Sequence, residues 1–264
     1  VFDPELMAVR RSLVGKGGKD VVVVNHAILE NLDERRPAMG VRGAALASIV
    51  ATGAGFAYPG HTEFLYALAP EAARPVMLLV SEELRVVPVT IHEPLARAIA
   101  RLTMDMIVET ARITAAGLIR DFGIVGPRLA IAGLNPHAGE NRLFGSEDAD
   151  ILAPAVAEAQ AAGINAFGPL PADALIPAAV KGKWNIVIAC YHDQGHAPFK
   201  AVFGDDGVNI TVGLPVVRVS VDHGTAFDIA GTGIAREASL VLSCERAAAL
   251  APGWDAVSAL TPIS

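Results

Sequence analysis

The chain has 264 residues, of which 52% are hydrophobic, and its formal net charge is −7 at pH 7. This acidic balance excludes a basic nucleic-acid-binding face and a polybasic membrane-binding patch. No apolar run reaches the roughly 20 residues that span a bilayer, and two cysteines are too few for a disulfide framework. The composition therefore predicts a cytoplasmic protein that acts on small molecules, with neither a nucleic-acid nor a membrane partner.

Buried β-runs and amphipathic segments alternate along the first half of the chain. The β-branched run at residues 21–24 predicts a strand. Two further runs, residues 75–80 and 85–90, are separated by a short polar segment and predict a β-hairpin. Residues 95–121 have helical periodicity and predict one or two helices.

The second half repeats this alternation. It predicts a turn at residues 168–173, strands at 128–133, 184–190 and 216–221, and helices at 146–162 and 237–250. Strands that alternate with helices indicate an α/β fold with a largely parallel sheet, to which the hairpin adds an antiparallel part. Residues 190–233, which include the strand predicted at 216–221, form a stretch rich in polar groups, and we interpret its remaining parts as functional loops beside buried strands.

Three histidines follow predicted strands directly: His92, His137 and His192. Because the carboxyl ends of neighbouring parallel strands meet at one edge of a sheet, we expect these imidazoles to converge. Three neutral imidazoles can bind a divalent metal and leave positions open for substrate oxygens. Each histidine taken alone is more typical of a packed or surface residue, so the residues by themselves favour the metal site and the structural role equally.

Several other polar residues are candidates for binding an anion. Lys200, Asn209 and Arg218 each lie beside an apolar run, and the apolar neighbours of Arg218 predict a buried guanidinium, which needs a counter-charge. Solvated surface charge is the alternative for Lys200. His61 and Thr62 lie in a glycine-led turn, which leaves the backbone free to approach a ligand, although an ordinary β-turn explains them slightly better.

The string Asp222-His223-Gly224-Thr225-Ala226-Phe227-Asp228-Ile229-Ala230-Gly231 is the most specific in the chain. A glycine-rich turn fits against a flat ligand, and a carboxylate at position 228 can accept hydrogen bonds from both ribose hydroxyls of an adenosine. The same carboxylate repels a 2′-phosphate, so NAD is favoured over NADP. A helix-entry loop with a capping Asp is the alternative. No GxGxxG string follows a strand, so a Rossmann domain is not supported.

The glycine-rich string resembles the adenosine-binding loop of the isocitrate and isopropylmalate dehydrogenase superfamily. Within that superfamily, the chain resembles the 4-hydroxythreonine-4-phosphate dehydrogenase family from about residue 55 to 240. Five strings carry this resemblance in order: Gly60-His61-Thr62-Glu63, Asn135-Pro136-His137-Ala138-Gly139-Glu140, Tyr191-His192-Asp193-Gln194-Gly195, Gly207-Val208-Asn209-Ile210-Thr211 and Val221-Asp222-His223-Gly224-Thr225-Ala226.

The resemblance implies a two-domain α/β fold with a mixed, mostly parallel sheet, helices on both faces and a cleft between the domains. Residues 1–60 and 205–264 would form the cofactor side, and residues 61–204 the substrate, metal and dimerisation domain. The implied protein is a homodimer whose metal site is completed across the subunit interface.

The family's functional residues map onto matching positions of this chain. The implied metal ligands are His92, His137 and His192, for Zn²⁺, Mg²⁺, Mn²⁺ or Co²⁺. The implied contacts to an anionic substrate are His61, Thr62, Lys200, Asn209 and Arg218, and those to NAD are His223, Gly224, Thr225 and Asp228.

The implied reaction is oxidation of 4-hydroxythreonine 4-phosphate, or of a close phosphorylated four-carbon hydroxy acid, at C3 by NAD, followed by loss of CO2. Metal binding lowers the pKa of the substrate hydroxyl. Asp193 and Lys200 are both candidate proton carriers, and the sequence does not choose between them.

The chain also departs from the family pattern. The family's initial Gly-Asp-Pro-Ala-Gly-Ile-Gly-Pro-Glu string is absent, so we expect segments to be missing within the first 55 residues. His196-Ala197-Pro198-Phe199 is more similar to a paralogous branch that includes dehydrogenases of 4-phospho-D-threonate, erythronate and a terephthalate cis-dihydrodiol. The alternatives are therefore the same chemistry on a dihydrodiol, or a catalytically decayed paralogue that binds metal or nucleotide.

Overall fold

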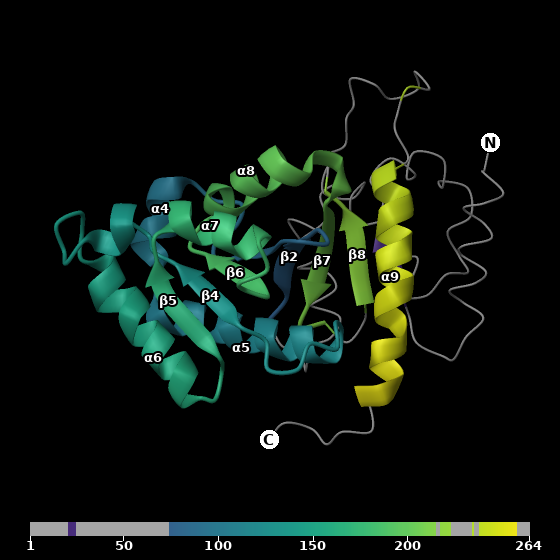
Figure 1. Cartoon of the computed structure of the whole chain (residues 1–264), viewed down its shortest axis with the longest axis horizontal. Coiled ribbons are helices and arrows are strands. Elements are labelled where there is room, and N and C mark those ends of the chain that lie inside the picture. The colour runs from purple at the N-terminus through teal and green to yellow at the C-terminus, as the bar shows by residue number, and fades with distance from the viewer. Residues whose placement is uncertain (1–20, 25–73, 215–216, 223–233, 235–237, 258–264) are drawn as a thin grey trace, which may run out of the picture. The chain divides into compact units, whose positions relative to one another are not determined.

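The computed structural model describes residues 21–24, 74–214, 217–222, 234 and 238–257 (Figure 1). The chain divides into two compact units, one formed by Val1–Pro75 with Val208–Ser264 and the other by Val76–Gly207. The boundaries expected from the sequence fall after residues 60 and 204. The functional roles expected for the two parts stay predictions.

The unit Val76–Gly207 contains five described strands in the spatial order β2-β3-β6-β4-β5. They are β2 (Val76–Val80), β3 (Arg85–Pro88), β4 (Leu129–Ala132), β5 (Ala166–Leu170) and β6 (Ile186–Ala189). β2 and β3 form the predicted antiparallel hairpin. All other pairings in this unit are parallel, joining β3 to β6, β6 to β4 and β4 to β5.

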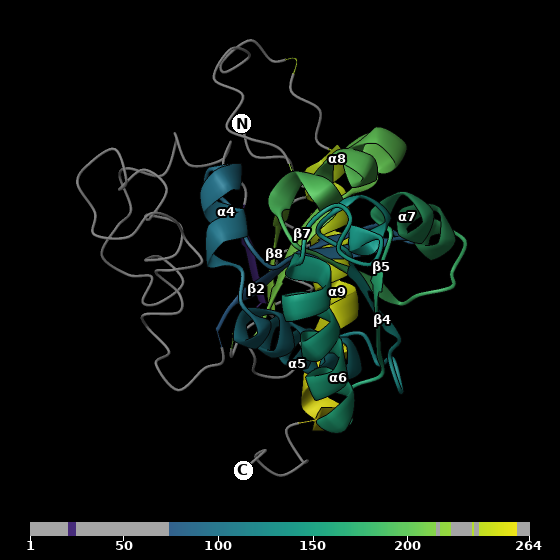
Figure 2. The same cartoon turned by 90° about the vertical axis from the view of Figure 1, so that its left-hand side faces the viewer.

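Helices cover both faces of this sheet (Figures 1 and 2). α7 (Ala172–Val180) and α8 (His192–Phe203) lie on one face. α5 (Met104–Arg120) and α6 (Ala153–Ala161) pack against each other and contact β2 and β5 respectively. The shorter elements are α4 (Leu95–Arg101), η3 (Pro136–Gly139), η4 (Asp148–Leu152) and η5 (Gly204–Asp206).

Alternate residues of each strand pack against the helices on opposite faces of the sheet. Leu79, Val86 and Val187 form a buried cluster with Leu175 of α7 and Phe199 of α8. The residues between them, such as those at positions 78, 87 and 188, are equally buried and point to the other face. Burial on both faces accounts for the continuous apolar runs that made these strands predictable.

α5 shows why residues 95–121 form two helices. Its buried residues Ile107, Ala111, Thr114 and Leu118 recur at intervals of three and four and form one stripe. The helix begins at Thr103, whose hydroxyl accepts a hydrogen bond from the backbone N–H of Met106 at 3.3 Å. The extended residues between α4 and α5 separate the two helices.

The other unit contains β1 (Val21–Val24), β7 (Val208–Val212), β8 (Val217–Val221) and α9 (Ala238–Val257) among the described residues. β8 pairs in parallel with β1 and antiparallel with β7. α9 packs along these strands, where Leu240 and Cys244 contact Val221. The strands predicted at residues 21–24 and 216–221 and the C-terminal helix are thereby confirmed.

Two predictions about local structure are wrong. The segment predicted as a turn at residues 168–173 instead contains the end of strand β5 and the start of α7, and β5 tolerates Pro169 because it lies at the edge of the sheet. The start of the polar stretch is not a loop but helix α8, and β7 follows it. A Cβ on Gly195 would overlap Val86 Cγ1, so this glycine lets α8 approach β3. No described helix has the length and apolarity needed to cross a bilayer.

Candidate active site

The three strands that precede the predicted metal ligands are neighbours in the sheet. β3, β6 and β4 lie side by side and run parallel, with Val86 opposite Val187 and Leu129 opposite Ile186. Their carboxyl ends therefore share one edge, at which the chain continues into the loops of His92 and His137 and into α8 at His192. The expected placement of these histidines at strand ends is correct.

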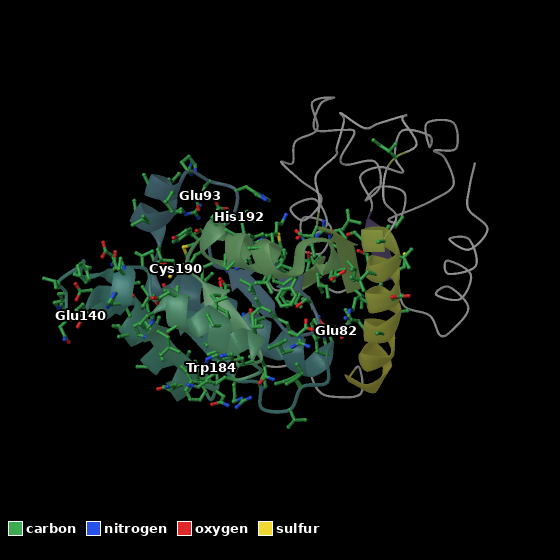
Figure 3. The ribbon with its side chains drawn as sticks, turned by 45° about the horizontal axis from the view of Figure 1, so that its top comes forward. Glu82, Glu93, Glu140, Trp184, Cys190 and His192 are labelled. Carbon is green, nitrogen blue, oxygen red and sulfur yellow. The ribbon has the colours of Figure 1, made fainter. Side chains whose placement is uncertain are left out.

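Two of the three predicted ligands are near each other. The rings of His92 and His192 have centroids 5.8 Å apart. Figure 3 labels His192 at this edge together with Glu93, which directly follows His92 and forms ion pairs with Arg97 and Arg101 of α4. These ion pairs tie the His92 loop to the helix that follows it.

His137 has different neighbours. Its Nδ1 lies 3.3 Å from Glu140 Oε2, and its ring centroid lies 6.0 Å from that of Phe144. Among the residues that the structure describes, no three His, Cys, Asp or Glu side chains form a group able to hold a metal ion. A single chain thus does not assemble the three-histidine site in its described part, and its completion by a second subunit stays a prediction.

His192 is the most constrained of the three. Its Nδ1 lies 2.6 Å from Asp193 Oδ1. The buried ring of His196 stacks on it with centroids 3.9 Å apart and planes 18° apart. His196 Nδ1 is also 3.1 Å from the carbonyl oxygen of His192. Burial, and then the nearby His192, lower the pKa of His196 to about 4, so this ring stays neutral at pH 7.

The His137 loop has an unusual backbone. Residues 137–142 all have positive φ, from 40° at Glu140 to 82° at Gly139. Left-handed conformations cost non-glycine residues roughly 1–2 kcal/mol each, so surrounding contacts must hold the loop in place.

The carboxylate of Asp148 supplies those contacts. This side chain is 2% exposed and accepts hydrogen bonds from Leu134 N at 2.8 Å and from Asn135 N and Nδ2, each at 3.0 Å. Asn135 Nδ2 also donates to Glu147 at 2.9 Å, and the pKa of Glu147 is lowered by a hydrogen bond from its own backbone and then by this one. The loop that carries His137 is therefore anchored at its start to the beginning of the next helix.

The predicted substrate residues fall on both units. Lys200 is exposed on α8, two turns beyond His192 and on the same helix face as His196. Arg218 is buried in β8, as its neighbours predict, and its Nη1 donates to Thr211 Oγ1 at 2.7 Å. Asn209 lies in β7, and its Oδ1 is buried with no hydrogen-bond partner among the described residues.

The remaining predicted residues lie outside the described part of the chain. They are His61 and Thr62 for the substrate, and His223, Gly224, Thr225 and Asp228 for NAD.

Asp148 and His196 are two residues of the site that sequence reasoning missed. His196 lies four residues after His192, the interval at which helical residues share a face, and this spacing could have revealed it. Asp148 follows Glu147 at a predicted helix start, where an acidic residue reads as an ordinary cap.

Comparison with known proteins identifies the family. The family model described as "Pyridoxal phosphate biosynthetic protein PdxA" matches residues 19–247. The chain belongs to the PdxA family. The resemblance seen in the sequence is confirmed.

Two PdxA relatives and one solved structure show what this chain is similar to. It is 61% identical over 206 residues to D-threonate 4-phosphate dehydrogenase of Bordetella bronchiseptica, covering 77% of this chain and 58% of that protein. It is 51% identical over 210 residues to 4-hydroxythreonine-4-phosphate dehydrogenase of Methylorubrum populi, covering 78% and 60%. The chain spans about three fifths of the length of these curated relatives.

The crystal structure of 4-hydroxythreonine-4-phosphate dehydrogenase from Klebsiella pneumoniae matches with a TM-score of 0.71 and 43% identity, covering 80% of this chain and 67% of that one. The predicted fold class, an α/β fold with a mostly parallel sheet between helices, is confirmed.

Proposed function

We propose that this PdxA-family protein is an NAD- and divalent-metal-dependent dehydrogenase that oxidises 4-phospho-D-threonate at C3 and then decarboxylates it. The observation that carries this choice of substrate is the 61% identity to D-threonate 4-phosphate dehydrogenase, against 51% to a 4-hydroxythreonine-4-phosphate dehydrogenase over a similar length. The similarity of the string His196–Phe199 to the paralogous branch supports the same substrate.

The histidines at the strand ends have the chemistry of metal ligands. Nδ1 of His192 and Nδ1 of His137 each face a carboxylate, a pairing that orients a metal-binding imidazole and leaves Nε2 for the metal. We assign His92, His137 and His192 as the ligands, with a second subunit completing the set. Imidazole donors suit Zn²⁺ or Co²⁺ better than Mn²⁺ or Mg²⁺. When bound, the metal lowers the pKa of the substrate hydroxyl.

Cationic and polar side chains would bind the two anionic ends of the substrate. Arg218 supplies a buried guanidinium held by Thr211, and a planar fork suits a phosphate or a carboxylate. Lys200 and Asn209 would add a charge and an amide, and His61 and Thr62 would complete the anion site. We assign His223, Gly224, Thr225 and Asp228 to NAD.

Decarboxylation follows oxidation because of the position of the carbonyl group that oxidation creates. The C3 hydroxyl gives its proton to a general base and C3 gives hydride to the nicotinamide, which leaves a ketone β to the C1 carboxylate. The C1–C2 bond then breaks, CO2 leaves, and its electron pair is protonated at C2, giving a phosphorylated three-carbon hydroxyketone. Because Asp193 is engaged by His192, Lys200 is the better candidate to move that proton.

4-Hydroxythreonine 4-phosphate is the second candidate substrate, favoured by the relatives and the solved structure of that name. The two acids differ at C2, which carries a hydroxyl in the threonate and an amine in the amino acid. A C2 ammonium would need a nearby acceptor, whereas a hydroxyl can donate or accept.

A substrate panel separates these functions. The protein is incubated with NAD, Co²⁺ or Mn²⁺ and either phosphorylated acid or a terephthalate-type dihydrodiol, and NADH and CO2 are measured. The proposal predicts that kcat/KM is highest for 4-phospho-D-threonate. A preference for the amino acid supports the second candidate, and turnover of the dihydrodiol alone refutes a phosphorylated substrate. Binding of NAD and metal without any turnover would indicate a decayed paralogue.

A further inference from the structure

The carboxyl ends of β4 and β6 are joined by one side chain. Gln194, in the first turn of α8, accepts a hydrogen bond at Oε1 from the backbone N–H of Cys190 at 2.7 Å. Its Nε2 donates to the carbonyl oxygen of Gly133, also at 2.7 Å and 61 residues away in the chain. One amide therefore bonds the residue after β6 and the residue after β4, and both of its functional groups are used.

The segment that follows β3 is bonded to Cys190 as well. Thr90 Oγ1 donates to the carbonyl oxygen of Cys190 at 2.9 Å, and the backbone N–H of Thr90 is 3.3 Å from that oxygen. Both residues are 3% exposed. Cys190 thus accepts from β3 through its carbonyl and donates to Gln194 through its N–H.

The three residues that these hydrogen bonds join, Thr90, Gly133 and Cys190, each lie shortly before one of the three strand-end histidines. Thr90 and Cys190 each lie two residues before their histidine, and Gly133 lies four residues before His137. A side chain does not fit at Gly133, because a Cβ there would meet Ala138 at 2.8 Å and Asp148 at 2.9 Å, so this residue packs closely against its own loop. The three strand ends are therefore joined by the side-chain hydrogen bonds of Thr90 and Gln194, in addition to the backbone hydrogen bond from Thr90 to Cys190.

We propose that Gln194 and Thr90 are positioning residues that set the separation of the His92, His137 and His192 loops. The inference rests on the proposed metal function of these histidines. Gln194 does not touch the metal; it fixes where the ligand-bearing loops begin. Groups of this kind around a metal site typically change metal affinity about 10- to 100-fold when they are altered.

The test compares two substitutions that remove the same type of hydrogen bond. Gln194→Glu keeps the acceptor for Cys190 and loses the donor to Gly133. Gln160→Glu is the matched control, because Gln160 Nε2 also donates to a backbone carbonyl, that of Ala166 at 2.8 Å, but at the amino end of β5. Each variant is titrated with Co²⁺, and the metal affinity, the visible Co²⁺ spectrum and KM against kcat are measured.

We expect Gln194→Glu to lower Co²⁺ affinity about 10- to 100-fold and to change the Co²⁺ spectrum, and Gln160→Glu to do neither. Thr90→Val, which removes only the hydroxyl donor, should lower affinity in the same direction, and Thr90→Ser should restore it. These two variants decide the question if Gln194→Glu does not fold. Wild-type affinity and spectrum in Gln194→Glu or Thr90→Val would overturn the positioning role. A wild-type protein that binds no Co²⁺ would instead refute the metal site of the proposed function, and the positioning role with it.

Discussion

Asp193 Oδ1 lies 2.6 Å from His192 Nδ1, at the first turn of α8. A carboxylate only accepts hydrogen bonds, so this contact is satisfied when Nδ1 carries the proton and Nε2 presents its lone pair. The neutral ring of His196, stacked 3.9 Å away, supports the imidazole from one face. These contacts would orient His192 for the metal-binding role proposed above.

Asp193→Asn tests this orientation. The amide provides no charge to hold the Nδ1 proton, so we expect metal affinity to fall about 10- to 100-fold, as measured by calorimetric titration with Co²⁺. Asp173→Asn, at an exposed position of α7, is the control. If Asp193 acts only by orientation, kcat recovers at saturating metal. A kcat that stays low at saturating metal would contradict this and make Asp193 the proton carrier.

Asp148→Ala tests the anchoring of the His137 loop. The substitution removes the acceptor for three hydrogen bonds from Leu134 and Asn135. Asn135 Nδ2 keeps its bond to Glu147, so two backbone donors lose their acceptor. Because each part-buried donor left unsatisfied costs about 1–3 kcal/mol, we expect the free energy of unfolding to fall by about 2–6 kcal/mol in urea titrations. Asp150→Ala removes an exposed partner of Arg142 and should leave the midpoint unchanged. Equal midpoints for the two variants would contradict the anchoring role.

Gly195→Ala tests the contact between α8 and the sheet. In an exposed helix this change stabilises by roughly 1 kcal/mol. Here the new methyl would overlap Val86 Cγ1 and lie 3.2 Å from Ala189 Cβ, so we expect destabilisation by about 1–3 kcal/mol. The measurement is the change in melting temperature of Gly195→Ala in thermal unfolding. A higher melting temperature than that of the wild type would mean that α8 does not pack closely on β3.

The two thiols provide a test of burial. Burial, and then the negative charge of Asp148, raise the pKa of Cys190 to about 12, and burial raises the pKa of Cys244. The thiolate is the reactive form, so at pH 8 neither cysteine should react with iodoacetamide until the protein is denatured.

The same shift makes stability depend on pH. The unfolded Cys190 thiol ionises above about pH 9 while the folded one stays protonated, so the free energy of unfolding should fall as pH rises beyond 9. This fall should be smaller in Cys190→Ala. Rapid labelling of Cys190 in the folded protein would refute its burial.

Much of the fold could be predicted from the sequence because buried strands and helices have recognisable patterns of apolar residues. Strands β4 (Leu129–Ala132) and β6 (Ile186–Ala189) are apolar and buried at every position, as expected for strands covered on both faces. The sequence of α8 has no such apolar pattern, and Gly195 and Pro198 within it are residues that disfavour helices. Gly195 is needed by a contact with β3, about 110 residues earlier in the chain, which local propensity does not encode.

The candidate site, too, was only partly predictable from the sequence. The strand-end positions of His92, His137 and His192 followed from the order of elements alone. The anchoring by Asp148 and the bridge made by Gln194 did not, because they act on backbone groups 13 to 61 residues away. Residues that bind are recognisable by their chemistry, whereas residues that position them are recognisable only by their contacts.

The most direct test of the metal-dependent mechanism is Co²⁺ binding and turnover in the wild type and in His192→Ala, measured on the same preparations. We predict that the wild type binds Co²⁺ and oxidises 4-phospho-D-threonate with NAD, and that the variant loses both activities together. A variant that still binds Co²⁺ with wild-type affinity and turns over at the wild-type rate would contradict the assignment of His192 as a metal ligand.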